Sequence, residues 1–211
     1  MAIVRVREHV NPLGIRFSKA IAPPKWETIF DEIARPWHLD IGCARGHFPL
    51  KMAAERPDWN VVGIEIREPL VDRANQWRDE AGLRNLYYLS CNANNSVRPI
   101  LESLPKGAVQ LVSVQFPDPW FKKRHQKRRV VQPPLVEELA MFLPMGAQVF
   151  LQSDVEEVAR EMGDRFAANT AFQKTHDGDW LPENPLPVRT EREISVIKQG
   201  LPVYRTQLAR V

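Results

Sequence analysis

A chain of 211 residues that is 44% hydrophobic and 26% charged has the size and composition of a single globular domain. No stretch approaches the roughly 18 consecutive apolar residues that a membrane span requires, and the first residues lack the apolar core of a signal peptide. The two cysteines, Cys43 and Cys91, match no metal-ligand spacing. We therefore expect a cytoplasmic protein with no metal and no membrane association.

The basic charge of the chain is concentrated in one place. Residues 122–129 carry three Lys and three Arg, a charge of +6, whereas the whole chain carries +3. Such a patch is the expected footprint of a phosphate backbone. Residues 1–20 add four basic residues against one acid. We predict a basic amino-terminal arm over residues 1–20 and one domain over residues 21–211.

Short apolar runs alternate with helical patterns from residue 37 onward. Strands are predicted at residues 37–42, 60–66, 86–90, 109–116 and 147–153, and helices at residues 48–56, 69–81, 134–143 and 155–168. Prolines predict a loop over residues 177–190. The alternating pattern over residues 193–210 predicts two strands that form a hairpin at Gly200.

This alternation predicts an α/β fold: a doubly wound, mostly parallel seven-stranded sheet with helices on both faces and a carboxyl-terminal antiparallel hairpin. Ligands of such folds bind beyond the carboxyl ends of the strands. Polar residues that follow the predicted strands are therefore the candidates for a site.

The turn after the first predicted strand, LDIGCARGHF, has small residues at alternate positions. Gly42 and Gly46 allow a sharp turn and a close approach to a ligand, and Asp40 precedes them. A nicotinamide fingerprint requires a glycine where His47 stands, which disfavours a dehydrogenase. The acid followed by G-x-A-x-G instead resembles motif I of S-adenosylmethionine (SAM)-dependent methyltransferases, and a carboxylate at Asp40 suits the cationic amino group of SAM.

The second and third predicted strands also end in polar residues. Glu65 is placed to accept the ribose hydroxyls of an adenosine. Asn92 and Asn94 follow the third strand and offer amides to an adenine edge. Three such features after three successive strands predict a nucleoside-cofactor fold.

The segment FPDPWFKKRHQKRR, residues 116–129, follows the fourth predicted strand. It places Asp118 between two prolines and directly before the basic run. The pattern P-D-P-W-x-K-x-R-H-x-K-R-R, with SDVEEVA and RTEREISVIKQGLPVYR further along, resembles the signature of the bacterial tRNA (guanine-N7)-methyltransferase family, TrmB, over residues 35–207. The resemblance implies a class I SAM-dependent methyltransferase with a Rossmann-like fold that methylates N7 of guanine 46 in the variable loop of tRNA.

The resemblance also implies roles for single residues. SAM-binding positions of the family match Asp40, Glu65, Asn92 and Asp118, and Asp118 matches the catalytic position. Its substrate-binding positions match Lys122, Asp154, Thr190, Glu191, Arg192 and Glu193. Two positions depart from the family pattern: Asn92 stands where Asp is usual, and Ala44 replaces the middle glycine.

The chemistry of the predicted reaction fits these residues. Guanine N7 carries no proton at neutral pH, so methyl transfer needs alignment and exclusion of water rather than a general base. The product ring is cationic, and the Asp118 carboxylate can stabilise that developing charge. We hypothesise that Glu191, Glu193 or Asp154 accepts the N–H donors of the Watson–Crick edge of guanine.

The basic run is predicted to hold RNA phosphates, with Trp120 and Phe121 offering stacking faces. The predicted phosphate contacts are Lys122, Lys123, Arg124, Lys127, Arg128 and Arg129. Two alternatives remain open: a methyltransferase acting on an amino group of adenine or cytosine, and a non-catalytic RNA-binding module on a methyltransferase fold. We expect a monomer, with a homodimer as the alternative.

Overall fold

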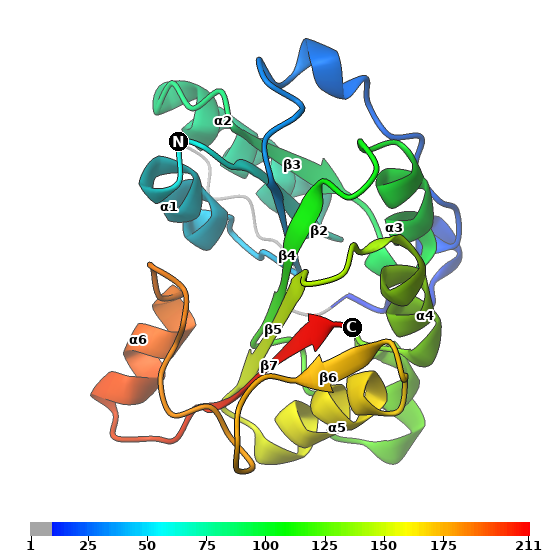
Figure 1. Cartoon of the computed structure of the whole chain (residues 1–211). Helices are drawn as coiled ribbons and strands as arrows, with labels where there is room; N and C mark the ends of the chain where they lie inside the picture. Colours follow the sequence, from blue (N-terminus) through cyan, green and yellow to red (C-terminus); the bar gives the residue numbers. More distant parts are fainter. Residues whose placement is uncertain (1–9) are drawn as a thin grey trace.

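A computed structural model describes residues 10–211 as a seven-stranded sheet between two layers of helices (Figure 1). The strand order is β3-β2-β1-β4-β5-β7-β6. The strands are β1 (Trp37–Ile41), β2 (Asn60–Glu65), β3 (Leu86–Ser90), β4 (Val109–Gln115), β5 (Gln148–Ser153), β6 (Phe172–Lys174) and β7 (Tyr204–Arg210). The helices are α1 (His47–Glu55), α2 (Glu68–Glu80), α3 (Ala93–Glu102), α4 (Pro133–Phe142), α5 (Glu156–Ala167) and α6 (Glu191–Lys198).

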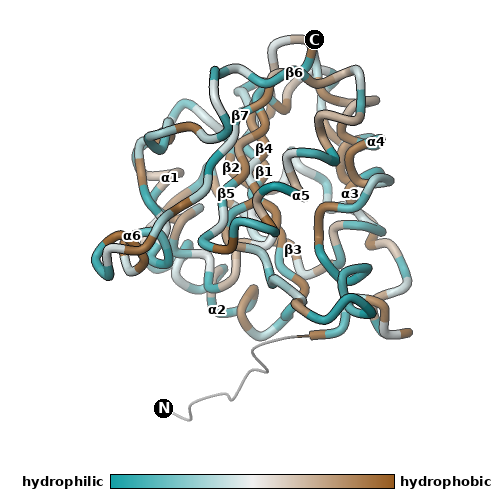
Figure 2. Tube along the Cα trace, turned by 90° about the horizontal axis from the view of Figure 1, so that it is seen from below, coloured by the Kyte–Doolittle hydropathy of each residue, from teal (hydrophilic) through white to brown (hydrophobic). Residues whose placement is uncertain are grey.

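Strands β1 to β5 run parallel to one another, and β7 runs antiparallel to both β5 and β6. Helices α1, α2 and α6 cover one face of the sheet, and α3, α4 and α5 cover the other (Figure 1). The strands are hydrophobic along most of their length, whereas hydrophilic and hydrophobic residues are mixed along the helices on either side (Figure 2). The predicted mostly parallel, doubly wound sheet is confirmed.

The main hydrophobic core lies between the sheet and α3, α4 and α5. Strand residues that face this layer are aliphatic, as in Leu39, Val112 and Leu151, and each is at least 99% buried. The opposite face of the central strands instead carries His38, Asp40, Ser113, Gln115 and Gln152, all of them buried. The polar chemistry of the protein is therefore on the face that α1 and α6 cover.

The predicted carboxyl-terminal hairpin is wrong in its first half, because residues 191–198 form α6. Thr190 caps this helix: its hydroxyl accepts a hydrogen bond from the Glu193 N–H at 3.0 Å. The helix ends at Lys198, and Gly200 follows with a φ of +70°; the Leu201 N–H donates to the Val196 carbonyl at 3.1 Å. The T-x-x-E capping box and this glycine were the available helix signals, but the alternation of E-I-S-V-I favoured a strand.

Two elements were missed in the sequence. Helix α3 begins at Ala93 and contains Pro99, and Asn92 caps it: the side-chain oxygen of Asn92 accepts from the Asn94 N–H at 3.1 Å. Strand β6 has only three residues, and two of them are exposed. Strand β6 pairs antiparallel with β7. The second strand of the predicted hairpin is therefore present as β7, but its partner is β6 rather than the segment before Gly200.

The amino-terminal arm was predicted over residues 1–20, of which residues 1–9 lie outside the described part of the chain. Residues 10–20 contact the domain directly. Asn92 donates to the carbonyl of Pro12 at 3.1 Å and to that of Phe17 at 3.3 Å. Arg16 pairs with Glu68 at 2.9 Å. This part of the arm is thus held against the ends of α2 and α3.

The substitution Gly46→Ala is expected to destabilise the fold strongly. The φ of Gly46 is +79°, and an added Cβ would lie 2.7 Å from a Tyr88 ring atom and 2.8 Å from the Ala74 Cβ. Left-handed strain and overpacking together predict a loss of about 3 kcal/mol in the free energy of unfolding. The matched control is Gly82→Ala, which has φ +65° and open space around the new Cβ and should lose about 1 kcal/mol. Equal losses in urea unfolding would contradict the packing argument.

Candidate active site

A cavity lies beyond the carboxyl ends of β1, β2, β3 and β4, where the doubly wound architecture places a ligand. Seven of the predicted site residues line it: Gly42, Glu65, Asn92, Asn94, Asp118, Trp120 and Arg128. The non-glycine residues with positive φ in the described chain are Ala44 (+51°), Phe116 (+49°) and Trp120 (+41°). All three line this cavity. Backbone strain of this kind concentrates at functional sites.

The cavity fits the chemistry of SAM. Gly42 has φ +83° and no atom within 4 Å of where a Cβ would stand, so its backbone is open to a ligand. Apolar side chains including Ile64, Ile66 and Val130 line the same space and suit an adenine ring. Gly46 does not line the cavity: it packs against Tyr88, which donates a hydrogen bond to the Gly46 carbonyl at 2.5 Å. Its contribution is therefore to the shape of the turn.

Glu65 is buried at the floor of the cavity and already accepts four hydrogen bonds. Its Oε2 accepts from the Ala44 N–H at 3.0 Å and from the Arg67 guanidinium at 3.1 Å. Its Oε1 accepts from the backbone N–H of Arg67 at 3.0 Å and from Arg67 Nε at 2.8 Å. A carboxylate has about four acceptor positions. For Glu65 to accept ribose hydroxyls, the Arg67 side chain has to move.

Asn92 lines the cavity but uses its amide elsewhere. Its oxygen caps α3, and its nitrogen donates to the carbonyls of Pro12 and Phe17. An aspartate at this position could cap the helix but could not donate to those carbonyls. The departure at this position thus ties the arm to the cavity rim. Asn94 likewise donates to the Val130 carbonyl at 2.9 Å.

Asp40 lies behind the glycine turn and is 3% exposed. Its Oδ1 accepts from the Ser113 hydroxyl at 2.5 Å and from the Gln115 amide at 3.3 Å. Burial raises the pKa of this carboxyl from 3.8 to about 6, against the lowering effect of the two hydrogen bonds. The charge of Asp40 therefore changes within an accessible pH range.

We expect SAM affinity to rise with pH through about pH 6. The family resemblance assigns the carboxylate of Asp40 to the cationic amino group of SAM, and the ionised fraction of this carboxylate grows as pH exceeds its pKa of about 6. Titration of SAM between pH 5 and pH 7.5 should show this rise, and the Asp40→Asn variant should be weaker and independent of pH. A parallel pH dependence in wild type and variant would contradict the assignment. We choose SAM affinity as the readout because the pH dependence of the free energy of unfolding combines two opposite effects. Burial raises the pKa of Asp40, whereas it lowers the pKa of His38 to about 3.

The loop that carries Asp118 is held by Arg129. The guanidinium of Arg129 donates to the Pro119 carbonyl at 2.7 Å and forms ion pairs with Glu157 at 2.8 Å and with Glu161. Arg129 is only 4% exposed. The predicted phosphate contact at Arg129 is therefore wrong: the side chain is buried and already paired with two carboxylates of α5.

The rest of the basic run divides into two groups. Lys122, Lys123, Arg124 and Lys127 are exposed on and beside a short 3-10 helix (Lys123–Arg128). Arg128 instead lies with its guanidinium carbon 4.9 Å from the centre of the Trp120 ring and lines the cavity. Trp120 is thus packed against a cation, whereas Phe121 is 67% exposed. The exposed group forms a cationic surface next to the Asp118 loop.

The charged substrate-binding residues predicted on α6 and at Asp154 all have side-chain partners within the protein. Asp154 forms an ion pair with Arg192, and Glu191 contacts His47 Nδ1 at 2.7 Å, which lowers the pKa of the Glu191 carboxyl. Glu193 is fully buried, and its carboxylate accepts from Arg205 at 2.8 Å and from Asn184 at 2.7 Å. Of the three carboxylates hypothesised to read guanine, only Asp154 and Glu191 reach the surface.

A buried chain of hydrogen bonds connects Glu193 to the cofactor turn. The Gln152 amide lies 3.2 Å from the Glu193 carboxylate and 2.7 Å from the Gln115 oxygen, and Gln115 in turn donates to Asp40. Sequence reasoning missed these glutamines and Arg67. The available signal was the presence of polar residues, Ser113 with Gln115 in one strand and Gln152 in another, in strands that are otherwise largely apolar.

The sheet order, the antiparallel β7 and the glycine turn after β1 define a class I SAM-dependent methyltransferase. The 16S rRNA methyltransferase KamB shares the fold with a TM-score of 0.61 at 18% identity, over 92% of this chain and 99% of that one. TrmN from Thermus thermophilus gives 0.57 at 16% identity, over 84% of this chain and 45% of that one.

Sequence comparison is more specific. The family model described as "Putative methyltransferase" matches residues 34–206. The tRNA (guanine-N(7)-)-methyltransferase of Trichormus variabilis is 58% identical over 211 residues, covering 100% of this chain and 98% of the relative. That of Synechococcus elongatus is 60% identical over 210 residues, with 100% and 98% covered. The chain belongs to the tRNA (guanine-N7)-methyltransferase family.

Within residues 10–211, no helix is long and apolar enough to cross a membrane. The same residues contain no cluster of three or more His, Cys, Asp or Glu side chains arranged to hold a metal ion.

Proposed function

We propose that the protein transfers the methyl group of SAM to N7 of guanine 46 in the variable loop of tRNA, and that it acts as a monomer. The observation that carries the proposal is the juxtaposition around Asp118. A strained loop brings this acid into the same cavity as Glu65 and Gly42. The 3-10 helix that carries the exposed lysines follows this loop directly in the chain. The names of the relatives support the substrate and the atom.

The residues divide the work by position. When bound, SAM supplies the methyl group. The turn at Gly42, with Asp40 behind it, holds the amino acid end, and Glu65 holds the ribose once Arg67 has moved. Asp118 faces the cavity and stabilises the positive charge that develops on the guanine ring. Because N7 has a free lone pair and no proton, no residue is required as a general base. The walls of the cavity exclude water and align the two reacting atoms.

The exposed lysines are expected to contact RNA phosphates. Replacing Lys123 and Lys127 together by Gln should weaken tRNA binding and reduce the log–log salt slope by about 1.4, since each single-strand phosphate contact contributes about 0.7. Lys25→Gln with Lys106→Gln removes the same charge from exposed positions near the amino ends of β1 and β4 and should leave the slope unchanged. Binding titrations over a salt series measure both. Equal slopes in the two double variants would show that the run is a solvated face.

A tRNA transcript with 7-deazaguanosine at position 46 tests both the atom and the site. This base keeps the Watson–Crick edge and lacks only the N7 lone pair, so methyl transfer should fall to background while tRNA binding is kept. Transfer to the deaza transcript at the normal rate would discard N7 of guanine 46 and favour the amino-group alternative. A transcript with 7-deazaguanosine at another variable-loop position is the matched control.

A further inference from the structure

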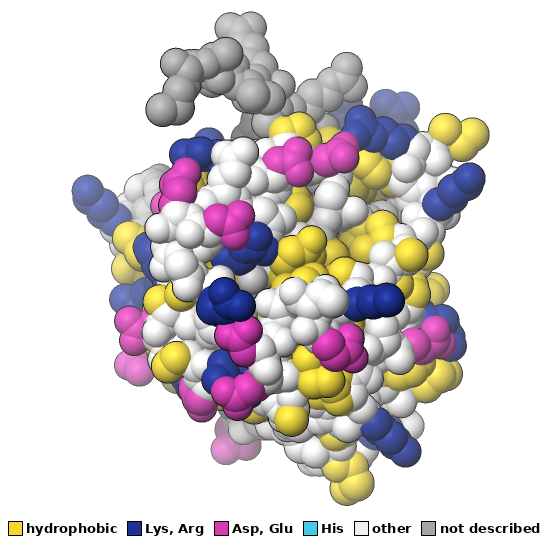
Figure 3. Space-filling view, turned by 90° about the horizontal axis from the view of Figure 1, so that it is seen from above, with side chains coloured by type: hydrophobic (Ala, Val, Ile, Leu, Met, Phe, Trp, Pro, Cys, Tyr) yellow, Lys and Arg dark blue, Asp and Glu magenta, His cyan; other side chains and the backbone are white. Residues whose placement is uncertain are grey.

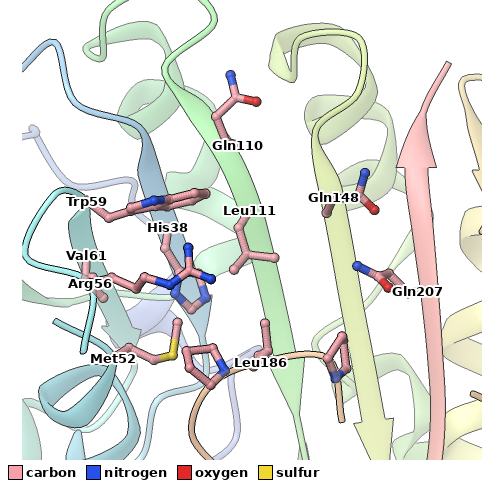
Figure 4. Close-up of a pocket in the computed structure, with 12 residues that line it drawn as sticks. His38, Met52, Arg56, Trp59, Val61, Gln110, Leu111, Gln148, Leu186 and Gln207 are labelled. Atoms are coloured by element: carbon pink, nitrogen blue, oxygen red, sulfur yellow. The ribbon is translucent and has the colours of Figure 1, made fainter. Parts of the chain in front are cut away.

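A second cavity lies at the opposite end of the parallel strands, where β1, β2, β4 and β5 begin (Figure 4). Figure 3 views this end of the molecule and shows hydrophobic side chains gathered near its centre, with Lys and Arg side chains around them. Trp59, Arg56 and Met52 lie on one side of the cavity, and Gln148 and Gln207 lie on the other (Figure 4). The Pro-Leu-Pro segment at residues 185–187 closes one end. The reaction proposed above uses none of these residues.

His38 gives this cavity a buried acceptor. The residue is 1% exposed, its Nδ1 has no hydrogen-bond partner, and its Nε2 lies 2.7 Å from the Ser113 hydroxyl. Ser113 must donate its only proton to the Asp40 carboxylate, 2.5 Å away, because an ionised carboxylate only accepts. Ser113 therefore accepts from His38 Nε2–H, and Nδ1 keeps its lone pair. Burial lowers the pKa of His38 to about 3, so the ring is neutral at physiological pH.

Arg56 gives the cavity a charge that nothing in its lining balances. Its guanidinium carbon lies 5.5 Å from the centre of the Trp59 ring. No Asp or Glu lines the cavity. The remaining walls are Leu111, Met52 and Leu186 together with neutral glutamine amides. The site thus combines one cation, one unpaired acceptor, and an aromatic and aliphatic surface.

We propose that this cavity is a second binding site, for a small planar anion: a heteroaromatic carboxylate or phosphate with an N–H or O–H donor. The anionic group pairs with Arg56, the ring packs between Trp59 and the aliphatic wall, and the donor satisfies His38 Nδ1. Burial of an unpaired polar atom costs free energy that such a ligand recovers. Because His38 connects through Ser113 to Asp40, occupancy of this site changes SAM affinity, and SAM changes affinity for the anion by the same factor.

Two probes with this chemistry test the site: orotate and indole-2-carboxylate. Each is titrated into the full chain with and without saturating S-adenosylhomocysteine, and the imidazole nitrogens of His38 are followed by NMR. We expect saturable binding and an upfield shift of the Nδ1 resonance. Saturating S-adenosylhomocysteine should change the Kd of the probe but leave its binding saturable, without displacing it stoichiometrically. Arg56→Gln should weaken binding at least tenfold, whereas Arg160→Gln, an exposed arginine on α5, should leave it unchanged.

Three results would overturn the proposal. Absence of binding by both probes at 10 mM would show that the cavity does not take this ligand class. Stoichiometric displacement by S-adenosylhomocysteine would place the probes in the cofactor cavity instead. Equal affinity in Arg56→Gln and wild type would remove the cation from the site. A second variant, His38→Asn, keeps the test independent of folding defects at Arg56, and circular dichroism of each variant reports whether it is folded. None of these readouts depends on methyl transfer to tRNA.

Discussion

The Asp118→Ala variant is expected to lose about 10²- to 10³-fold in kcat for methyl transfer, because removing one electrostatic stabiliser of a developing charge typically costs this much. Asp118 lies between two prolines in a loop whose flanking residues, Phe116 and Trp120, have positive φ. This loop places Asp118 in the lining of the cavity. The loss should therefore appear in kcat more than in the affinity for tRNA.

The measurement is single-turnover methyl transfer from labelled SAM, with both substrates saturating. Asp118→Asn distinguishes charge from positioning: it keeps the shape and hydrogen-bonding capacity but not the charge, and it should be nearly as slow as the alanine variant. Asp164→Ala, on α5 and away from the cavity, is the matched control and should keep the wild-type rate. Near-normal turnover by Asp118→Ala would remove Asp118 from the reaction. A rate for Asp118→Asn close to wild type would leave it only a positioning role.

The Arg129→Gln variant is expected to lose both stability and activity, although Arg129 lies outside the cavity. Its guanidinium joins the Pro119 carbonyl to two carboxylates of α5, and it is buried. Breaking a buried pair predicts a loss of about 3 kcal/mol in the free energy of unfolding, at the lower end because Glu157 reaches solvent. Release of Pro119 lets the neighbouring Asp118 move, and a displacement of about 1 Å lowers kcat about 10²-fold.

Arg124→Gln is the matched control for Arg129, since both belong to the same basic run and Arg124 is exposed. It should lower tRNA affinity and the salt slope but leave the urea midpoint and kcat unchanged. Arg129→Gln should show the reverse pattern. Arg129→Lys keeps the charge without the forked geometry and should be intermediate in both stability and kcat. If Arg129→Gln changed the salt slope and left the stability unchanged, Arg129 would be a phosphate contact after all.

The sequence was sufficient for the parallel part of the fold. Buried strands of a parallel sheet read as continuous apolar runs, and the five parallel strands differ from their predicted ranges by at most one residue at each end. Helix α6 was not found because its exposed face carries Ile194 and Ile197, which makes the segment alternate like a strand. Glu193 and Val196 are both buried. Because they are three residues apart, they lie on the same face of a helix, and their burial stabilises the helix rather than a strand.

Pairing partners were beyond the reach of the sequence. Arg129 and Arg124 have the same side chain in one basic run, and only the approach of Glu157 and Glu161 from α5 separates them. In the same way, nothing local distinguishes the surface carboxylate of Glu191 from the buried one of Glu193. Glu65 was identified as a ribose acceptor from its position after β2, but the Arg67 guanidinium that occupies it depends on side-chain geometry.

The most direct test of the account is methyl transfer from labelled SAM to an unmodified tRNA transcript, with the product nucleoside identified by mass and chromatography and its position mapped. We expect 7-methylguanosine at position 46, formed by the wild-type protein and at least 10²-fold more slowly by Asp118→Ala. Transfer that yields N6-methyladenosine or N4-methylcytidine, or no transfer despite measurable SAM binding, would contradict it.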